Sequence, residues 1–199
     1  FGDYVGGILN PLFSITALFA LLYTIALQAK ELRDSSEQLK KSADALIIQN
    51  QVLLKQSFES SFFNLVGQFN ELVRDLVAPN GNSKGKECFA WLNDSLVTMY
   101  MDSVIRGDFT EATHEAVEIQ YKKFYRTNEH LMGHYFRTLY NIMKFINNSH
   151  LDSSEKQFYT GIIRAQLSKY ELSLILYNCA SSHGREKFLP LVIKYNILK

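Results

Sequence analysis

The chain has 199 residues, of which 47% are hydrophobic and 21% are charged, and its formal net charge is +1 at pH 7. This balance argues against a protein that binds nucleic acid through a broad basic surface, and two cysteines are too few for a disulfide framework. Only three prolines and ten glycines are present, and no sustained alternation of polar and apolar residues suggests strands. The composition therefore favours an all-α protein.

The first expected element is an apolar helix within residues 1–29. No charged residue lies between Asp3 and Lys30, and Pro11 suits the first turn of a helix. At about 1.5 Å per residue, the stretch from Pro11 to Ala29 would cover roughly 28 Å, close to the hydrocarbon core of about 30 Å. The segment therefore predicts a transmembrane helix, and the alternative is a fully buried helix of a soluble core.

Basic residues follow this apolar segment, and none precedes it: Lys30, Arg33, Lys40 and Lys41 lie just beyond its end. Because positively charged flanks favour the cytoplasmic side of a membrane, we expect the residues after about 30 to lie in the cytoplasm. For a full-length protein that starts in the cytoplasm, this orientation also predicts a further apolar segment upstream of Phe1.

A heptad pattern occupies residues 30–57. Leucine recurs at every seventh position, with small or polar residues between. The leucines are Leu32, Leu39, Leu46 and Leu53, and the interleaved residues are Ser36, Ala43, Asn50 and Ser57. In heptad notation the leucines occupy position d, and an asparagine at position a typically specifies register. We predict a coiled-coil-like stem that forms a homo-oligomer, and a seam against the chain's own body is the alternative.

Residues 58–199 predict a compact helical bundle. From Phe58 to Leu76, apolar residues recur every three or four positions and form a wide face suited to a globular core. Further helices are expected at 87–106, from about 108 to 127, at 130–146, at 155–180 and around Pro190. Asp108 or Thr110 could cap the second of these.

Several stretches resemble one bacterial family when they are taken together. They are the lead-in FGDYVGGILNPL, the junction QSFESSFFNL, the pair HYFRTLYNIMKFI and YTGIIRAQLSKYELSLILYN, and the ending REKFLPLVIKYNIL. In this order they resemble the "putative phage abortive infection protein" family, an AbiC-like group, least so between about Ala78 and Tyr121. The resemblance implies a membrane-anchored helical protein of antiphage defence that faces the cytoplasm. It supplies no catalytic residues.

Candidate chemistry is sparse, and we predict no catalytic residue, no cofactor and no metal site. His130 and His134 share one helix face, but a structural metal site needs three or four ligands. The spacing from Arg126 to His130 does not match the Arg-x4–6-His motif of many helical ribonuclease toxins. No Walker loop and no GxSxG elbow is present in the sequence.

Polar residues interrupt the apolar faces of two predicted helices. They are Tyr135, Arg137, Tyr140, Arg164, Gln166, Tyr170, Glu171 and Asn178. A buried arginine needs a partner, and either Arg164 or Glu171 could pair across to the neighbouring helix, for example Glu171 with Arg137. We interpret this set as a polar network that locks two helices together, with a ligand or partner pocket as the alternative.

Together these features predict a membrane-anchored component of bacterial antiphage defence that acts by abortive infection at the inner membrane. Its cytoplasmic helical domain would sense a phage or defence-system protein, and a stem would couple this domain to the membrane segment. The expected partners are the lipid bilayer and further copies of the chain, with no strong signal for nucleic acid. A membrane-tethered nuclease and a non-defence membrane scaffold are the alternatives, and the residues favour a role without catalysis.

Overall fold

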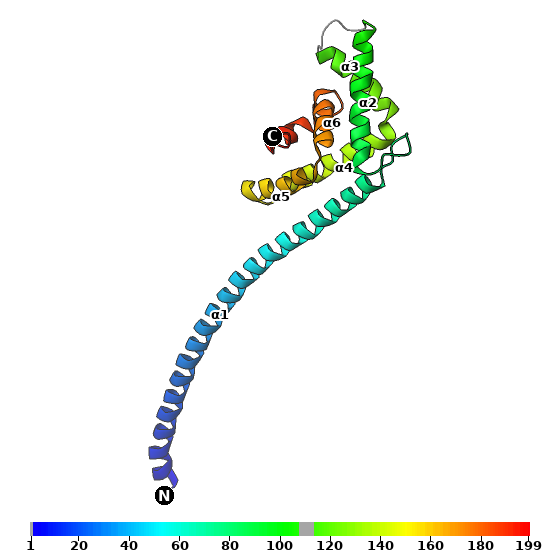
Figure 1. Ribbon diagram of the computed structural model, residues 1–199. Coiled ribbons are helices and arrows are strands. Elements are labelled where there is room, and N and C mark those ends of the chain that lie inside the picture. Colours follow the sequence, from blue (N-terminus) through cyan, green and yellow to red (C-terminus); the bar gives the residue numbers. More distant parts are fainter. Residues whose placement is uncertain (1, 108–113) are drawn as a thin grey trace. The chain divides into compact units, whose positions relative to one another are not determined.

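This computed structural model describes residues 2–107 and 114–199 (Figure 1). Within these residues the chain forms seven helices and no β-strand. The predicted all-α fold class is confirmed. The expected helix caps Asp108 and Thr110 lie outside the described residues. The chain divides into two units, Phe1–Ser57 and Phe58–Lys199.

The longest element is α1 (Gly2–Asp75), a single α-helix that extends from the first unit into the second. Pro11 lies inside this helix, so the helix begins earlier than a proline in the first turn would predict. A proline removes one helical hydrogen bond, and the hydroxyl of Ser14 donates to the carbonyl oxygen of Asn10 at 2.8 Å. The carbonyl that loses its helical donor is that of Gly7, four residues before Pro11, so the Ser14 bond does not replace the missing one.

The last part of α1 supplies one wall of the core of the second unit. Phe62, Val66, Phe69 and Val73 are buried, and they recur at the spacings of three and four that the sequence shows. Phe58 stacks on Phe145, with ring centroids 5.0 Å apart. The aromatic stretch of α1 therefore belongs to the globular part of the protein.

Six shorter helices complete the second unit. They are α2 (Lys86–Ile105), α3 (His114–Thr127), α4 (Glu129–Asn147), α5 (Ser153–Gln166), α6 (Lys169–Ala180) and α7 (Leu189–Lys194). Helix α2 packs against α3 and α6, whereas α4 packs against α3, α5 and α7. A turn with a single antiparallel bridge between Val77 and Lys84 joins α1 to α2.

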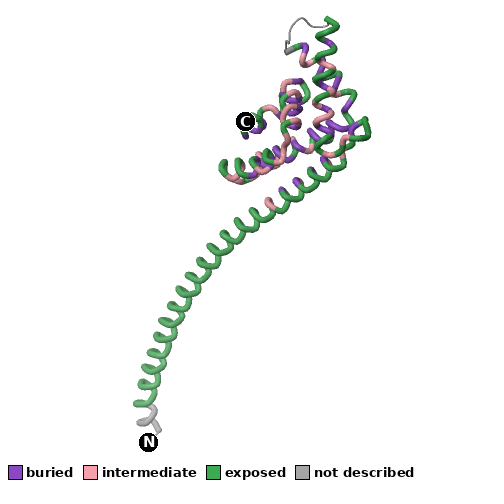
Figure 2. The backbone as a smooth tube through the Cα atoms, in the orientation of Figure 1, coloured by how far each residue is buried: buried purple, intermediate pink, exposed green. Residues whose placement is uncertain are grey.

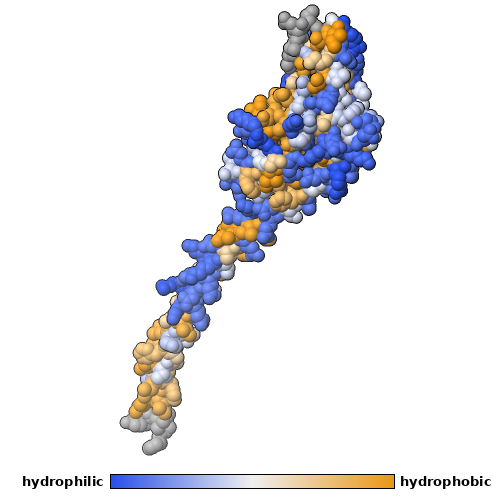
Figure 3. Space-filling view, in the orientation of Figure 1, coloured by the Kyte–Doolittle hydropathy of each residue, from blue (hydrophilic) through white to orange (hydrophobic). Residues whose placement is uncertain are grey.

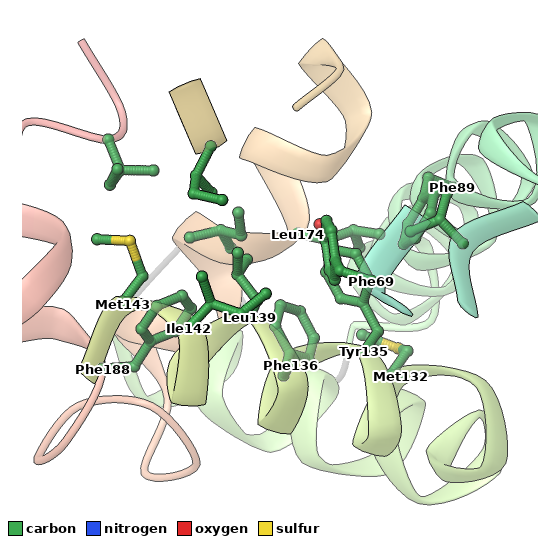
Figure 4. Close-up of a cluster of buried hydrophobic side chains, with 14 of the residues drawn as sticks. Phe69, Phe89, Met132, Tyr135, Phe136, Leu139, Ile142, Met143, Leu174 and Phe188 are labelled. Carbon is green, nitrogen blue, oxygen red and sulfur yellow. The ribbon is translucent and has the colours of Figure 1, made fainter. Parts of the chain in front are cut away.

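Helix α4 lies at the centre of the core. Tyr135, Leu139 and Ile142 of this helix are almost completely buried, and their side chains gather with those of neighbouring elements, including Phe69 and Leu174 (Figure 4). Apolar residues at intervals of three and four along α4 give it this buried face. Because one helix contacts so many others, polar side chains on α4 are well placed to link elements.

One predicted helix is two helices in the structure. The expected single helix at 155–180 is interrupted after Gln166, and α6 begins at Lys169. The Ser168 hydroxyl accepts a hydrogen bond from the backbone N–H of Glu171, and the Glu171 carboxylate accepts one from the backbone N–H of Ser168. This reciprocal capping box starts a new helix, so the prediction of one continuous helix was wrong.

Candidate functional site

The eight polar residues singled out in the sequence do not form one connected network in the described residues. Tyr135, Glu171 and Asn178 are buried, Tyr140, Gln166 and Tyr170 are half-buried, and Arg137 and Arg164 are exposed. The buried residues take part in two separate contacts, one between α4 and α6 and one between α3 and α6.

The first contact joins Tyr135 of α4 to Glu171 of α6. The Tyr135 hydroxyl donates to Glu171 Oε1 at 3.0 Å, and the two side chains are 0% and 1% exposed. The other carboxylate oxygen, Oε2, accepts the backbone N–H of Ser168 at 2.7 Å. Burial, and then the nearby Glu171, raises the pKa of Tyr135 well above its ordinary value. The tyrosine therefore remains a neutral donor to the buried carboxyl group.

Arg137 does not take the predicted place beside Glu171, and Arg164 does not reach across to α4. Arg137 is exposed on α4, and Arg164 donates from Nε to the carbonyl oxygen of Ile197 at 3.3 Å. Glu171 is held by neutral donors instead, which avoids the cost of burying a guanidinium group.

Replacing Tyr135 with phenylalanine should lower the free energy of unfolding by about 1–3 kcal/mol, because a buried acceptor loses its donor while the ring stays in place. Tyr140→Phe is the matched control, since Tyr140 is half-buried on the same helix. Chemical unfolding of the detergent-solubilised chain measures both values. Equal stability of the two variants would show that the Tyr135 hydroxyl contributes nothing.

The second contact fixes the turn after α6. Asn178 Nδ2 donates to the hydroxyl oxygen of Tyr121 in α3 at 3.1 Å. The Asn178 carbonyl oxygen accepts the Ser181 hydroxyl at 2.8 Å and the backbone N–H of Gly184 at 3.1 Å. Burial raises the pKa of the Tyr121 phenol. Asn178 is therefore a structural link between α3, α6 and the turn that follows.

Gly184→Ala should destabilise the fold by about 1–3 kcal/mol through overpacking. A Cβ atom on Gly184 would lie 2.8 Å from the carbonyl oxygen of Asn178, and it would also clash with Oδ1 of that residue. Gly161→Ala is the control, because nothing lies within 4 Å of a Cβ atom there. Within α5 this second change should stabilise by up to about 1 kcal/mol. Thermal unfolding midpoints that fall equally for both variants would contradict this account.

The turn after α6 also places His183 over one face of α3, a grouping that no local sequence pattern shows. The centroids of the His183 and Tyr125 rings are 4.3 Å apart. Glu118 pairs with Lys122 at 3.0 Å and with Arg185 at 3.3 Å. The hydrogen bond from Lys122 is the main reason why the pKa of Glu118 falls to about 2. Burial and then the Lys122 charge lower the pKa of His183.

This surface group joins α3 to the turn by paired charges and ring contacts. It offers no metal centre: among the described residues, no three His, Cys, Asp or Glu side chains lie close enough to hold an ion. The thiols of Cys88 and Cys179 are buried, and burial raises the pKa of each, to about 12 for Cys179. Buried thiols of this kind are poor nucleophiles.

Stability should fall as the pH rises above about 10, the ordinary pKa of tyrosine. Burial, and then the hydrogen bond with Glu59, raises the pKa of Tyr159 to about 12. A group with a raised folded-state pKa ionises more readily in the unfolded chain, so its contribution is complete below pH 10 and is lost between pH 10 and 12. Urea unfolding at pH 9 and pH 11 tests this, and Tyr159→Phe should reduce the difference. A flat profile would contradict it.

The polar contacts of α4 and α6 lie in a part of the chain that is similar to a known family. Residues 127–199 match the family model "Putative phage abortive infection protein". The match confirms the suspected family resemblance over α4 to α7, whereas the lead-in FGDYVGGILNPL and the junction QSFESSFFNL lie outside the matched residues. No curated protein and no solved structure was found to match. Tyr135, Glu171, Asn178 and His183 all lie within the matched part.

Upstream of the part that matches the phage abortive infection family, every residue from 7 to 57 is exposed (Figure 2). The first part of α1 presents an apolar surface (Figure 3), on which Phe13 and Phe19 are each 67% exposed. Within the described residues, α1 is the one helix long and apolar enough to cross a membrane. The hydroxyl of Thr24 donates to the carbonyl oxygen of Ala20 at 2.8 Å. This bond gives the hydroxyl a partner within the helix, which it would need in lipid because hydrocarbon offers none.

Proposed function

We propose that the chain is a membrane-anchored component of bacterial antiphage defence and acts by abortive infection. The observation that carries this proposal is the family match over residues 127–199. In addition, α1 contains an exposed apolar segment, and its last part packs into the core of the folded domain. Exposed side chains such as Leu18 and Leu22, 55% and 53% exposed, are stabilised in lipid and disfavoured in water.

The proposed location is the inner membrane, with residues after about 30 in the cytoplasm. Support comes from Lys30, Arg33, Lys40 and Lys41, which follow the apolar segment and by the positive-inside rule favour the cytoplasmic side. In this orientation the helical domain of residues 58–199 can meet phage products inside the cell.

The proposed mechanism couples recognition to the membrane through α1. The helical domain senses a phage protein or a defence-system partner, and the stem of residues 30–57 holds copies of the chain together. Binding rearranges the stem, and the membrane segment then damages the infected cell before phage are released. No cofactor and no catalytic group is required for this sequence of events.

Measurement of membrane potential during infection tests this mechanism. Cells that carry the full chain should depolarise before the normal time of lysis and release few phage, whereas infected cells without it should stay polarised until lysis. A chain that protects the culture while the infected cells remain polarised would rule out the membrane as the target.

A further inference from the structure

The stem of residues 30–57 differs between its two halves. In the first half, the positions that directly follow Leu32 and Leu39 are Arg33 and Lys40; in the second half, both equivalent positions are apolar. Leu46, Ile47, Leu53 and Leu54 are 64%, 59%, 54% and 58% exposed. Apolar surface suited to a contact is therefore concentrated in the last two heptads.

Asn50 lies at the centre of this apolar surface. On a helix, residues three and four positions away on either side surround a given side chain. For Asn50 these neighbours are the four residues just described, and we call the five residues the Asn50 patch: Leu46, Ile47, Asn50, Leu53 and Leu54. A single amide is thus enclosed by exposed apolar side chains on one face of α1.

The Asn50 amide needs a hydrogen-bond donor and an acceptor, and this need determines which partner can cover the patch. A lipid surface would cover the four apolar side chains but would leave the Asn50 amide without a partner, which is unfavourable. A second copy of the same helix, parallel and in register, brings another Asn50 to the same place. Each amide then has both a donor and an acceptor opposite it, as paired asparagines in coiled coils do.

We propose that copies of the chain associate in parallel and in register through the Asn50 patch, with the two Asn50 amides hydrogen-bonded to each other. The inference rests on the proposed function, because a shared membrane anchor is what aligns the copies. Anchoring also raises the effective concentration of one copy near another, so a short patch suffices. Leu32 and Leu39, with charged neighbours, contribute little to the contact.

Disulfide cross-linking of the full chain in native membranes tests this proposal. Leu53→Cys places a thiol within the patch, and Ile48→Cys places one on the opposite side of the helix, at a residue that is 62% exposed. The natural thiols Cys88 and Cys179 are buried, so they should add little background. Mild oxidation should give a cross-linked dimer with Leu53→Cys and little with Ile48→Cys.

An isosteric substitution that introduces a charge at position 50 tests the role of the amide. In the Leu53→Cys background, Asn50→Asp would place two carboxylates opposite each other and should reduce the cross-linked fraction about fivefold. Gln51→Glu makes the same change of charge one residue away, outside the patch, and should leave the fraction within about twofold. Leu39→Ala should also leave it unchanged.

Equal cross-linking of Leu53→Cys and Ile48→Cys would overturn the proposal, and so would equal effects of Asn50→Asp and Gln51→Glu. Membrane fractionation and phage plating of the same strains separate this failure from that of the proposed function. A chain that is membrane-bound and protective without selective cross-linking refutes the Asn50 contact alone. A chain absent from membranes refutes the anchoring proposal, whether or not it cross-links.

Discussion

Replacing both Leu18 and Leu22 with arginine is expected to shift the chain from the membrane fraction to the soluble or aggregated fraction. Both residues lie within the apolar segment of α1 and are more than half exposed. Each arginine near the centre of a spanning helix costs about 2.5–3.5 kcal/mol on insertion scales, so the pair opposes insertion by roughly 5–7 kcal/mol. Quantitative immunoblotting of carbonate-washed membranes measures the change.

The matched control places the same two charges in the stem. Leu32→Arg with Leu39→Arg changes residues that are 72% and 69% exposed and that, in the proposed orientation, lie in the cytoplasm, where arginine is tolerated. This variant should remain in the membrane fraction. If both double variants fractionate as the unaltered chain does, the apolar segment is not the anchor.

Phe62→Ala is expected to destabilise the second unit by about 3–5 kcal/mol, the usual cost of removing a buried aromatic ring. Phe62 is fully buried, and its ring lies against those of Phe58 and Tyr159, with centroids 6.1 Å and 5.0 Å away. A loss of this size is a large part of the stability of a typical domain. Near-UV circular dichroism of the solubilised chain during thermal unfolding reports it.

Phe63 provides the control for this prediction. It is the next residue in the same helix, yet it is 55% exposed, so Phe63→Ala should change the free energy of unfolding by less than about 1 kcal/mol. A similar loss for the two variants would mean that the aromatic stretch of α1 does not pack as described.

The helical architecture could be predicted because its signals are local. Apolar residues at spacings of three and four from Phe58 onward identify the buried face of α1 without knowledge of its neighbours. The division between α5 and α6 could also have been predicted from the sequence, since Ser168 and Glu171 have the spacing of a capping box. It was missed because apolar residues continue on both sides of Ser168 and suggest one helix.

The polar contacts were predicted less well because their partners are distant in sequence. The sequence singles out Asn178 as a polar residue in an apolar helix, but its partner Tyr121 lies 57 positions away. No sequence pattern around Tyr121 indicates this hydrogen bond. For Glu171, Arg137 of the neighbouring helix was the expected partner, whereas the hydroxyl of Tyr135, 36 positions away, binds it. The position of His183 over α3 depends on how the turn at Gly184 packs, which no periodicity encodes.

Phage plating on cells that carry either the intact chain or a variant without residues 11–28 tests the central claim most directly. Both strains should contain equal amounts of protein, checked by immunoblot. The account predicts that the intact chain lowers plaque numbers while the infected cells die, and that the variant gives no protection. Equal protection by the two proteins would contradict a defence that acts through a membrane anchor.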